Sequence, residues 1–276
     1  MFPFGEAHEL DFGRLLIQRA NGGRLLLPVA PCLLRLTQRV VLVDAGLDPG
    51  LADRVEGVEW QRPARDLAAQ LETLGLTLDD VGDVVLTHLH DDHGGGVFDR
   101  RREAPVFPNA RLHVQELALW QGLDRAARGG ERFVSPVLLD WLLQTPLAVH
   151  HHGDWRLCEE LAVTHTGGHT PGHQIALAGE GLLRRVEDPA GGEERLHWQP
   201  AGDGHGDLLL GGDLLSLKAC FHPDFRTSSD VEPERARARR ADLGAAAVRG
   251  LVCYLYHGTP GRRFWRPESR SPDPQS

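Results

Sequence analysis

The chain has 276 residues, of which 41% are hydrophobic and 25% are charged, and its formal net charge is −9. This length and composition predict one large globular domain with a full hydrophobic core. The acidic balance argues against nucleic acid as a partner, because phosphate binding needs a basic face.

The sequence shows no pattern typical of export or membrane insertion. No run approaches 18 apolar residues, and the first six residues lack a basic start followed by an apolar stretch. Four cysteines are scattered without the spacing of a metal site, so we expect reduced thiols in a cytoplasmic protein without a membrane partner. These cysteines are Cys32, Cys158, Cys220 and Cys253.

Strand patterns and amphipathic helices alternate along the chain, which is typical of a layered α/β domain. In chain order, the predicted strands are residues 25–36, 40–43, 84–87, 111–114, 157–165, 174–177, 208–210 and 251–256. The predicted helices are residues 63–74, 115–127 and 232–248. The first two strands predict a hairpin, and Gly75 is typical of the residue that ends a helix.

Two segments are interpreted as insertions in a single domain that spans residues 1–266. Residues 184–206, rich in Gly, Glu and Pro, predict a long exposed hairpin loop. Residues 126–146 are rich in apolar side chains. They are expected to form either an ordinary helix packed on the core or a lid over a substrate. The histidine tract at residues 150–152 is expected to be a solvated loop. Residues 267–276 carry Pro, Ser and charge and are expected to form a disordered tail.

Residues 88–93 read His-Leu-His-Asp-Asp-His and follow the apolar run at 84–87. A β-branched apolar run that stops at histidine and aspartate predicts a buried strand whose C-terminal loop reaches a metal. His88 and His90 point the same way if the backbone stays extended, while the last aspartate and histidine of the loop face another point. One short loop therefore offers two pairs of ligands, which favours two metals over one.

Other apolar runs finish in the same way, with aspartate or histidine beside glycine. The residues are Asp44, His169, Asp213 and His257. This recurrence is expected if several strand ends converge on one site.

The ordered set of these residues resembles the metallo-β-lactamase superfamily of binuclear hydrolases. The set consists of Asp44, His88-x-His90-x-Asp92-His93, His169, Asp213 and His257. The resemblance covers roughly residues 25–260. It implies an α/β fold of the αββα type, in which two mixed sheets face each other, helices lie outside, and the site sits at one edge.

The same resemblance implies a role for each residue of the set. His88, His90 and His169 would hold one metal ion. The other ion would be held by Asp92, His93 and His257, with Asp213 bridging the two ions. Asp44 would orient a histidine rather than bind metal, and a supporting role of the same kind is expected for His173.

Two divalent ions at about 3.5–4 Å acidify a bridging water, so that a metal-bound hydroxide becomes the nucleophile near neutral pH. Asp92 and Asp213, which would hold the ions around this hydroxide, are the predicted catalytic residues. No serine, cysteine or lysine nucleophile is needed. Mixed histidine and carboxylate ligands suit zinc and also tolerate manganese, iron or cobalt. The expected reaction is metal-assisted hydrolysis.

Residues 168–174 and 106–110 are similar to segments of the quorum-quenching N-acyl-homoserine lactonases and their lactonase-like relatives. The similarity implies a small-molecule substrate, a five-membered lactone with an acyl amide, which is opened to the hydroxy acid. It also implies a possible homodimer, since relatives often dimerise.

One position departs from that branch of the family. Its well-known members carry a tyrosine three residues after the bridging aspartate, and here that position is Ser216. Either Tyr256, His222 or Lys218 substitutes for the tyrosine, or the metals suffice, or the substrate differs.

The predicted substrate pocket combines residues near the ligands with aromatic residues of the apolar insertion. It consists of Ser216, Phe133, Trp141, Phe221, His222 and Tyr256. Two alternatives to a lactonase stay open. A phosphotriesterase-like or other ester or thioester hydrolase of the same superfamily would share every ligand, and a metal-binding sensor module would share them without turnover.

Overall fold

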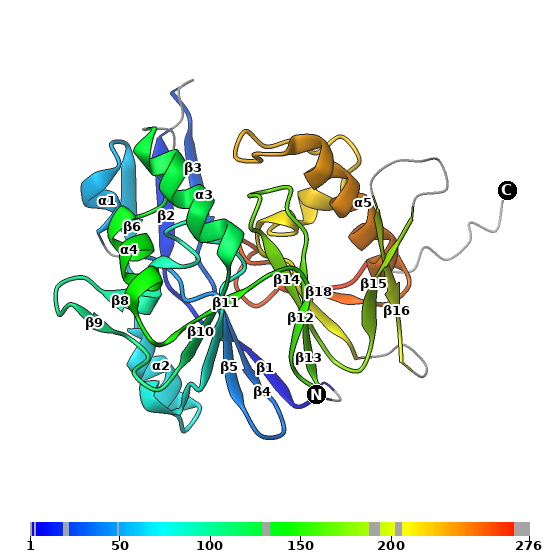
Figure 1. Ribbon diagram of the computed structural model, residues 1–276, viewed down its shortest axis with the longest axis horizontal. Helices are drawn as coiled ribbons and strands as arrows, with labels where there is room; N and C mark the ends of the chain where they lie inside the picture. Colours follow the sequence, from blue (N-terminus) through cyan, green and yellow to red (C-terminus); the bar gives the residue numbers. More distant parts are fainter. Residues whose placement is uncertain are drawn as a thin grey trace, which may run out of the picture.

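The computed structural model describes residues 2, 4–18, 22–48, 50–128, 133–187, 194–201 and 206–267. Two six-stranded sheets face each other, and helices cover their outer faces (Figure 1). This arrangement confirms the predicted αββα sandwich. Residues 268–276, which make up nearly all of the predicted disordered tail, lie outside the described residues.

The two large sheets are built from the two halves of the chain. In spatial order, the first sheet contains β1 (Glu6–Glu9), β4 (Cys32–Arg35), β5 (Val40–Val43), β7 (Asp83–Val85), β10 (Arg111–Gln115) and β11 (Ala148–His151). The second contains β12 (Trp155–Cys158), β13 (Leu161–His165), β14 (Gln174–Ala178), β17 (Leu208–Leu210), β18 (Val252–Tyr254) and β19 (Phe264–Trp265).

Parallel pairing places several strand ends at one edge of the sandwich. In the first sheet β5, β7, β10 and β11 run parallel, and in the second sheet β17 and β18 run parallel. The loops that follow parallel strands emerge on the same side of a sheet. The loops after β5, β7, β17 and β18 therefore gather at that edge.

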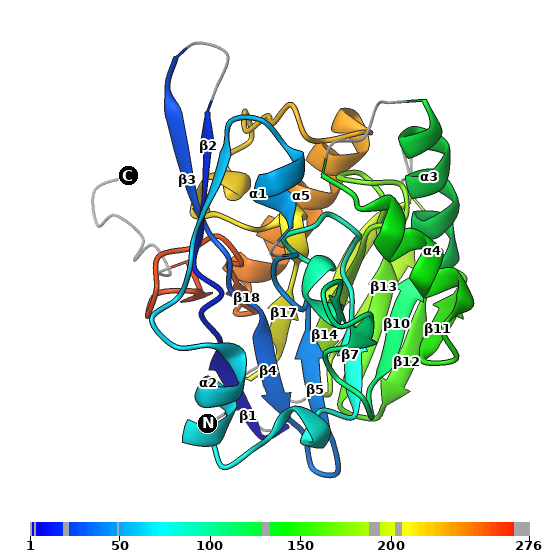
Figure 2. The ribbon, with the colours of Figure 1, turned by 90° about the vertical axis from the view of Figure 1, so that its left-hand side faces the viewer.

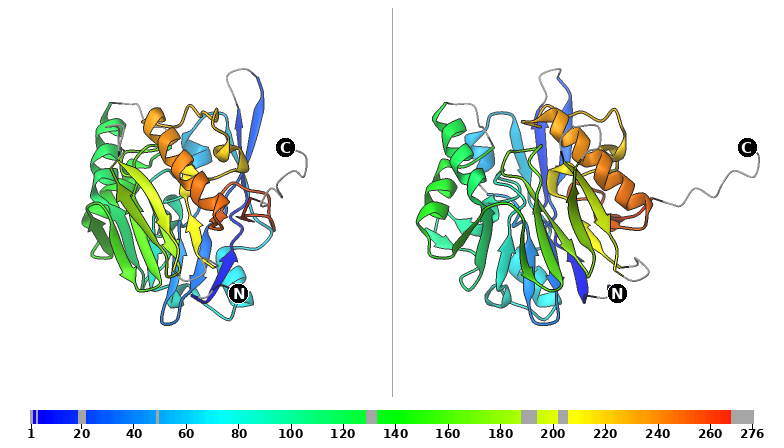
Figure 3. Two further views of the ribbon diagram at one scale, coloured as in Figure 1. Left: turned by 90° about the vertical axis from the view of Figure 1, so that its right-hand side faces the viewer. Right: turned by 45° about the vertical axis from the view of Figure 1, so that its right-hand side comes forward.

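Helices complete the outer layers. On the first sheet lie α2 (Leu67–Thr73), α3 (Glu116–Ala127) and α4 (Pro136–Gln144), as Figure 2 shows, and on the second lies α5 (Pro233–Val248), as Figure 3 shows. A single helical turn, α1 (Leu51–Arg54), precedes β6 (Val58–Gln61). The 3-10 turns are η1 (Leu78–Asp80), η2 (Gly95–Val97), η3 (Gly212–Leu214) and η4 (Lys218–Phe221). Asp66 begins α2 by accepting a hydrogen bond from Ala69 N, at 2.9 Å.

Alternation along the strands supplies three apolar layers. On β14, Ala176 and Ala178 face the other sheet, while Ile175 and Leu177 pack against the α5 side. On β5, Leu42 packs toward the helices of the first sheet. Because both faces of each central strand are buried, these strands appear in the sequence as uninterrupted apolar runs.

Smaller sheets complete the fold. One contains β3 (Arg24–Pro28), β2 (Arg14–Gln18) and β6 (Val58–Gln61). Another pairs β15 (Leu182–Val186) with β16 (Arg195–Gln199), and the last pairs β8 (Phe98–Asp99) with β9 (Ala104–Pro105). Among the described residues, no helix combines the length and the apolar content that a membrane crossing needs.

Two predicted strands are each two strands in the structure. The strand predicted at 25–36 is wrong because β3 and β4 belong to different sheets. The chain passes between the sheets at residues 29–31, where Pro31 lacks the N–H that a ladder would need. The strand predicted at 157–165 is part of the β12–β13 hairpin, which turns at residues 159–160.

The segment predicted as a long exposed loop at 184–206 contains most of the β15–β16 hairpin. Trp198 of β16 is fully buried, and its Nε1 donates to Asp207 at 2.9 Å. Leu196 is also buried, in the apolar cluster beneath α5. The prediction of an exposed loop is therefore wrong for β16, because alternate side chains of this strand face the core. Residues 188–193 and 202–205 lie outside the described residues.

The histidine tract is a solvated loop only at His152, whose side chain is 80% exposed, because His150 and His151 belong to β11. His151 ends β11 and stacks on Trp155, with the ring centroids 3.7 Å apart. Its Nε2 lies 2.9 Å from Nδ1 of His113, whose other ring nitrogen lies 2.9 Å from Asp83. Parallel pairing of β10 with β11 brings these side chains together, which the tract alone does not reveal.

Candidate metal centre

Seven side chains of the predicted ligand set meet at the edge where the strand ends gather. Their ligand atoms form two groups, and within each group all ligand atoms lie within 4.8 Å of one another. The first group is His88, His90, His169 and Asp213, and the second is Asp92, His93 and His257. They come from the loops that follow β7, β17 and β18 and from the turn that precedes β14.

The Asp213 carboxylate lies between the two groups. Its Oδ2 is 3.5 Å from Nε2 of His169 in the first group. Its Oδ1 is 3.1 Å from Nε2 of His93 and 3.2 Å from Nε2 of His257 in the second group. One oxygen therefore faces each group, which is the geometry of a bridging carboxylate.

The first group brings three ring nitrogens together. Nδ1 of His90 lies 2.9 Å from Nε2 of His88 and 3.1 Å from Nε2 of His169. Ring nitrogens that point at one another repel unless a proton or a cation lies between them. Three imidazole nitrogens and a carboxylate oxygen form a donor set that suits a transition metal such as zinc.

The second group is looser but has the same chemistry. Oδ2 of Asp92 lies 3.6 Å from Nε2 of His257 and 3.9 Å from Nε2 of His93. Nε2 of His93 and Oδ1 of Asp213 are buried and lie 3.1 Å apart, but neither makes a hydrogen bond of good geometry among the described residues. Buried polar atoms without a partner are rare in folded proteins, and a cation between them would satisfy both. The residues therefore fit two metal ions.

Asp44 holds one ligand from behind. Its Oδ2 accepts a hydrogen bond from Nδ1 of His93 at 2.8 Å and from the Thr87 hydroxyl at 2.9 Å. Its Oδ1 accepts from the Thr87 N–H at 2.7 Å. Asp44 has a φ of +60°, an uncommon backbone conformation for a residue other than glycine. These contacts direct Nε2 of His93 toward Asp213.

The sequence did not indicate Asp230, which holds His169 in the same way. Oδ1 of Asp230 lies 3.1 Å from Nδ1 of His169. Two nitrogens of Arg240 donate to the Asp230 carboxylate at 2.6 and 2.9 Å. Burial alone would raise the pKa of Asp230, but His169 and Arg240 outweigh it and lower that pKa. No apolar strand leads into Asp230, so the strand-end pattern could not find it.

A backbone carbonyl orients the ligand that follows β18. Nδ1 of His257 donates to the carbonyl of Pro28 at 2.6 Å. Pro28 is the last residue of β3, so the small three-stranded sheet supports the second group. Such a contact has no signal in the sequence, because every residue has a carbonyl.

His173 lies next to the first group and outside both. Its ring centroid is 5.4 Å from that of His88, and its Nδ1 lies 2.8 Å from the Thr166 hydroxyl. Burial, followed by the nearby His169, lowers the pKa of His173 well below its usual value. A buried, neutral His173 is consistent with the supporting position expected for it.

The pKa shifts of the buried histidines differ between the two groups. Burial and three neighbouring histidines hold the pKa of His88 well below its usual value. Burial alone would also lower the pKa of His93, but Asp213, Asp44 and Asp92 raise it well above that value. The second group is therefore rich in negative charge, which a bound cation would neutralise.

Tyr256 and Ser216 support the ligands from within the core. Tyr256 is buried, stacks on His93 with the ring centroids 3.9 Å apart, and donates its hydroxyl to the carbonyl of Asp92 at 2.5 Å. Ser216 is also buried, and its carbonyl accepts the N–H of His257 at 3.0 Å. The structure does not present either residue as an exposed pocket wall.

The other predicted pocket residues are not gathered around the two groups. Phe221 and His222 line a separate cavity of about 450 Å³ beside α5. Trp141 stacks on Phe98, with ring centroids 4.7 Å apart, on the helix side of the first sheet. The carbonyl of Phe133 accepts the N–H of Asp91, in the ligand loop, at 2.6 Å, and its side chain packs against the core cluster between the sheets. Phe133 and Trp141 therefore pack against apolar clusters and His222 is exposed beside α5, so a substrate pocket formed by these residues stays a prediction.

Solvent reaches the centre mainly at its carboxylates. The exposed fraction of the side chain is 14% for Asp92 and 17% for Asp213, while that of His93 and His169 is at most 1%. A substrate would therefore approach the face that bears these two aspartates.

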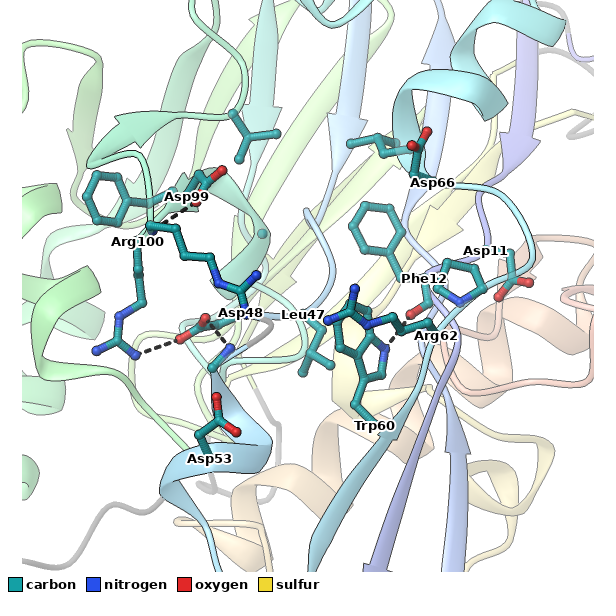
Figure 4. Close-up of a pocket in the computed structure, with 17 residues that line it drawn as sticks. Asp11, Phe12, Leu47, Asp48, Asp53, Trp60, Arg62, Asp66, Asp99 and Arg100 are labelled. Carbon is teal, nitrogen blue, oxygen red and sulfur yellow. Dashed lines mark hydrogen bonds and ion pairs between the residues drawn. The ribbon is translucent and has the colours of Figure 1, made fainter.

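A larger cavity, of about 680 Å³, borders the ligand loop without containing any of the seven residues. Figure 4 shows aromatic and charged side chains around it, including Trp60, Arg62 and an ion pair of Arg100 with Asp48 at 3.2 Å. The N–H of Asp48 donates to the carbonyl of Asp91 at 3.0 Å. By its size this cavity could be the substrate site, but none of the seven metal-binding residues lines it. We therefore assign the chemistry to the two groups of ligands.

Comparisons with known proteins are consistent with this geometry. Residues 27–183 match the family model described as the metallo-beta-lactamase superfamily. An N-acyl homoserine lactonase from a Bacillus species is 28% identical over 178 residues, which cover 61% of this chain and 65% of that protein. A probable metallo-hydrolase of Mycobacterium tuberculosis is 37% identical over 122 residues, 41% of this chain and 35% of that protein. The chain thus spans less than two thirds of the length of either relative.

Solved structures share the fold over nearly the whole chain. A dizinc quorum-quenching lactonase in complex with its product has a TM-score of 0.70 at 19% identity and covers 98% of this chain and 93% of its own. A probable metal-dependent hydrolase from Staphylococcus aureus has a TM-score of 0.70 at 18% identity, with 94% and 91% covered.

Proposed function

Because this chain belongs to the metallo-β-lactamase superfamily, we propose that it is a metal-dependent hydrolase that opens lactones, above all N-acyl homoserine lactones, to hydroxy acids. The observation that carries the proposal is the position of Asp213, whose two oxygens face two separate groups of ligands. The lactonase names of the Bacillus and Agrobacterium relatives support the choice of substrate.

Each of the two groups of residues would hold one ion. His88, His90 and His169 would hold one zinc ion, and Asp92, His93 and His257 would hold the other, with Asp213 shared. The chemistry supplied by two such ions is Lewis acidity at the carbonyl oxygen and a water acidic enough to attack near neutral pH.

The two partly exposed carboxylates, Asp92 and Asp213, are the groups that can orient the attacking water. Ring opening forms a bond between the water oxygen and the carbonyl carbon and breaks the bond from that carbon to the ring oxygen. The proton lost by the water ends on the released alcohol. Asp44, Asp230 and the Pro28 carbonyl keep the rings of three histidines in place.

A panel of substrates tests the proposal. Zinc-loaded protein would be assayed on N-hexanoyl-homoserine lactone, γ-hexalactone, a thioester and a phosphotriester, with Asp213→Ala as the inactive control. We expect the acyl-homoserine lactone to give the highest kcat/KM and the purified protein to carry close to two ions per chain. A phosphotriester turned over faster than every lactone would favour the phosphotriesterase-like alternative instead. A cytoplasmic location, quorum quenching and a homodimer stay predictions.

A further inference from the structure

Gln174 is a buried amide that connects the two large sheets beside the first metal-binding group. It is the first residue of β14, in the second sheet, and is only 1% exposed. Its backbone N–H donates to the carbonyl of Thr87 at 2.8 Å, and its side-chain Nε2 donates to the carbonyl of Leu86 at 2.7 Å. These two carbonyls follow β7 of the first sheet and immediately precede the ligand His88. Gln174 itself belongs to neither group of ligands.

The oxygen of the same amide is held by two donors. Oε1 of Gln174 accepts from Nε2 of Gln115 at 2.8 Å and from the indole Nε1 of Trp155 at 3.0 Å. An indole N–H can only donate and a backbone carbonyl can only accept, so the partners determine which end of the amide is oxygen. Gln115 is fixed in turn by the backbone of Gly153, since it donates to the carbonyl at 2.8 Å and accepts from the N–H at 3.0 Å. The Gln174 side chain therefore has a single orientation.

A carboxamide of this length satisfies both sets of partners at once. An ionised glutamate would keep the acceptor but would place a carboxylate against the carbonyl of Leu86. An apolar side chain would deprive that carbonyl, and the donors on Gln115 and Trp155, of this partner. The loss of a buried hydrogen-bond partner is unfavourable. Hydrogen bonding, and not packing alone, therefore specifies glutamine at position 174.

The turn that carries His169 is closed on itself immediately before Gln174. The N–H groups of Thr166 and Gly167 both donate to the carbonyl of His173, at 2.8 and 3.1 Å. These bonds join the two ends of the turn, so the turn and Gln174 keep one relative position. The contact of Gln174 with the first sheet therefore also places the turn against the strand end that carries the other histidines of the first group.

The first group depends on this placement because its histidines come from both sheets. Nδ1 of His90 lies 2.9 Å from Nε2 of His88, which is in the same loop, and 3.1 Å from Nε2 of His169, which is in the turn before β14. Distances from a metal to its ligands stay within about 0.2 Å of their usual values. A small shift of the turn relative to the loop would therefore weaken the site.

We propose that Gln174 is a positioning residue for the first metal-binding group. Its amide sets the distance between the strand end that carries His88 and the turn that carries His169. It acts through hydrogen bonds to the backbone and is not itself a ligand. The inference rests on the metal centre of the proposed function and is independent of which substrate is hydrolysed.

Zinc affinity and the coordination geometry of cobalt test the proposal. Gln174→Met keeps roughly the length of the side chain and removes its hydrogen bonds, whereas Gln174→Asn keeps the amide but is too short to reach both sets of partners. Trp198→Phe is the matched control, because it removes a buried hydrogen bond to Asp207 from β16, a strand that supplies no ligand. Competition with a chromophoric chelator gives the zinc Kd, and the visible absorption spectrum of cobalt(II)-loaded protein reports the coordination geometry.

We expect zinc to bind about tenfold more weakly to Gln174→Met and Gln174→Asn than to wild type, because the support of a ligand is lost. The cobalt(II) spectrum should change in both variants. Trp198→Phe should lower Tm while its zinc Kd and its cobalt(II) spectrum stay at the wild-type values.

The outcomes separate positioning from a role in stability alone. Gln174→Met with a lower Tm, but with the zinc Kd and cobalt(II) spectrum of wild type, would overturn the proposal. If Gln174→Met does not fold, Gln174→Asn decides by the same two measurements. Wild type that binds no zinc overturns this inference together with the proposed function, whereas wild type that binds two zinc ions and opens no lactone contradicts the proposed function alone.

Discussion

The Asp230 carboxylate connects the ligand His169 to the Arg240 guanidinium, and all three side chains are almost fully buried. Arg240 also donates to the carbonyls of Leu214 and Asp213, at 2.9 and 3.3 Å. One buried arginine therefore ties the turn that carries the bridging carboxylate to the group that orients a histidine. Such outer contacts set the tautomer and direction of a metal-binding ring.

Replacing Asp230→Asn should weaken zinc binding by roughly 10- to 100-fold, because the amide keeps the size of the carboxylate but loses its charge toward His169. Competition with a chromophoric chelator would measure the affinity. Asp224→Asn is the matched control, since the side chain of Asp224 is 88% exposed. Equal zinc affinities for wild type and Asp230→Asn would remove the orienting role.

Ser216 follows the predicted bridging aspartate by three residues, is buried, and its carbonyl supports His257. Truncating the hydroxyl in Ser216→Ala leaves that backbone contact in place. We therefore expect kcat/KM on the acyl-homoserine lactone to change by less than about tenfold, or roughly 1.4 kcal/mol of barrier. A loss of several orders of magnitude with both metals retained would show that the hydroxyl takes part in the reaction.

Helix α4, which the apolar segment 126–146 contains, is packed against the first sheet. In α4 the buried side chains are Leu138, Leu139 and Leu142, which belong to the apolar cluster on the outer face of the first sheet. Trp141 stacks on Phe98 in the same layer. This packing explains the apolar composition of α4, and a lid over the substrate is not needed to explain it.

Trp141→Ala should therefore lower the free energy of unfolding by about 2 kcal/mol, because a half-buried indole and its stacking contact are lost. The KM values across a ladder of acyl lengths should keep their wild-type pattern. Urea unfolding and steady-state kinetics measure the two effects. Trp120→Ala is the control, since Trp120 is 55% exposed. An unchanged stability with a selective rise in KM for long chains would restore the lid interpretation.

His151, the last residue of the edge strand β11, is expected to make the stability of the protein depend on pH. Burial, followed by the nearby His113, His150 and His152, lowers the pKa of His151 from 6.5 to about 4. Between these two values the unfolded chain binds a proton at this residue that the folded protein does not. Stability from this group is therefore complete above pH 6.5 and is lost as the pH falls toward 4.

The free energy of unfolding of wild type should accordingly fall more steeply between pH 7 and pH 4.5 than that of His151→Gln. Urea titrations at several pH values give the two slopes. His222→Gln serves as the control because its side chain is 68% exposed. Parallel pH profiles for wild type and His151→Gln would contradict the effect of burial on His151.

At the scale of the whole molecule, the metal centre joins the two halves of the sandwich. The loop at 88–93 follows β7 of the first sheet, whereas Asp213 and His257 follow β17 and β18 of the second. Ions held by residues of both sheets would link the sheets at this edge. The small sheet takes part as well, through the Pro28 carbonyl on His257.

Chelation of the metals should therefore lower the Tm of the whole protein in one cooperative step. Binding to the folded state alone stabilises it by about 4 kcal/mol when the free ligand is at 1,000 times its Kd. Differential scanning calorimetry with and without chelator measures the change, and zinc rather than magnesium should reverse it. The same Tm in loaded and chelated protein would show that the ions do not link the sheets.

The sequence by itself predicted the ligands and the layers. Buried strands appear as uninterrupted apolar runs, and each is followed by a turn that contains glycine, a local pattern that a single chain shows without its structure. His88, Asp213 and His257 each stand where such a run ends, so the pattern predicted them as ligands, and the family resemblance that they carry implied the sandwich.

Only the tertiary structure decided what surrounds those ligands. Asp230 reaches His169 across 61 positions of the chain, and Pro28 reaches His257 across 229. Gln121 and Thr170 come close together only because the turn after His169 packs on α3. An aromatic residue such as Trp141 can pack in a core or line a pocket, and the sequence alone does not distinguish the two positions. These relations depend on how layers pack, and packing leaves no periodic trace in the residues that make the contact.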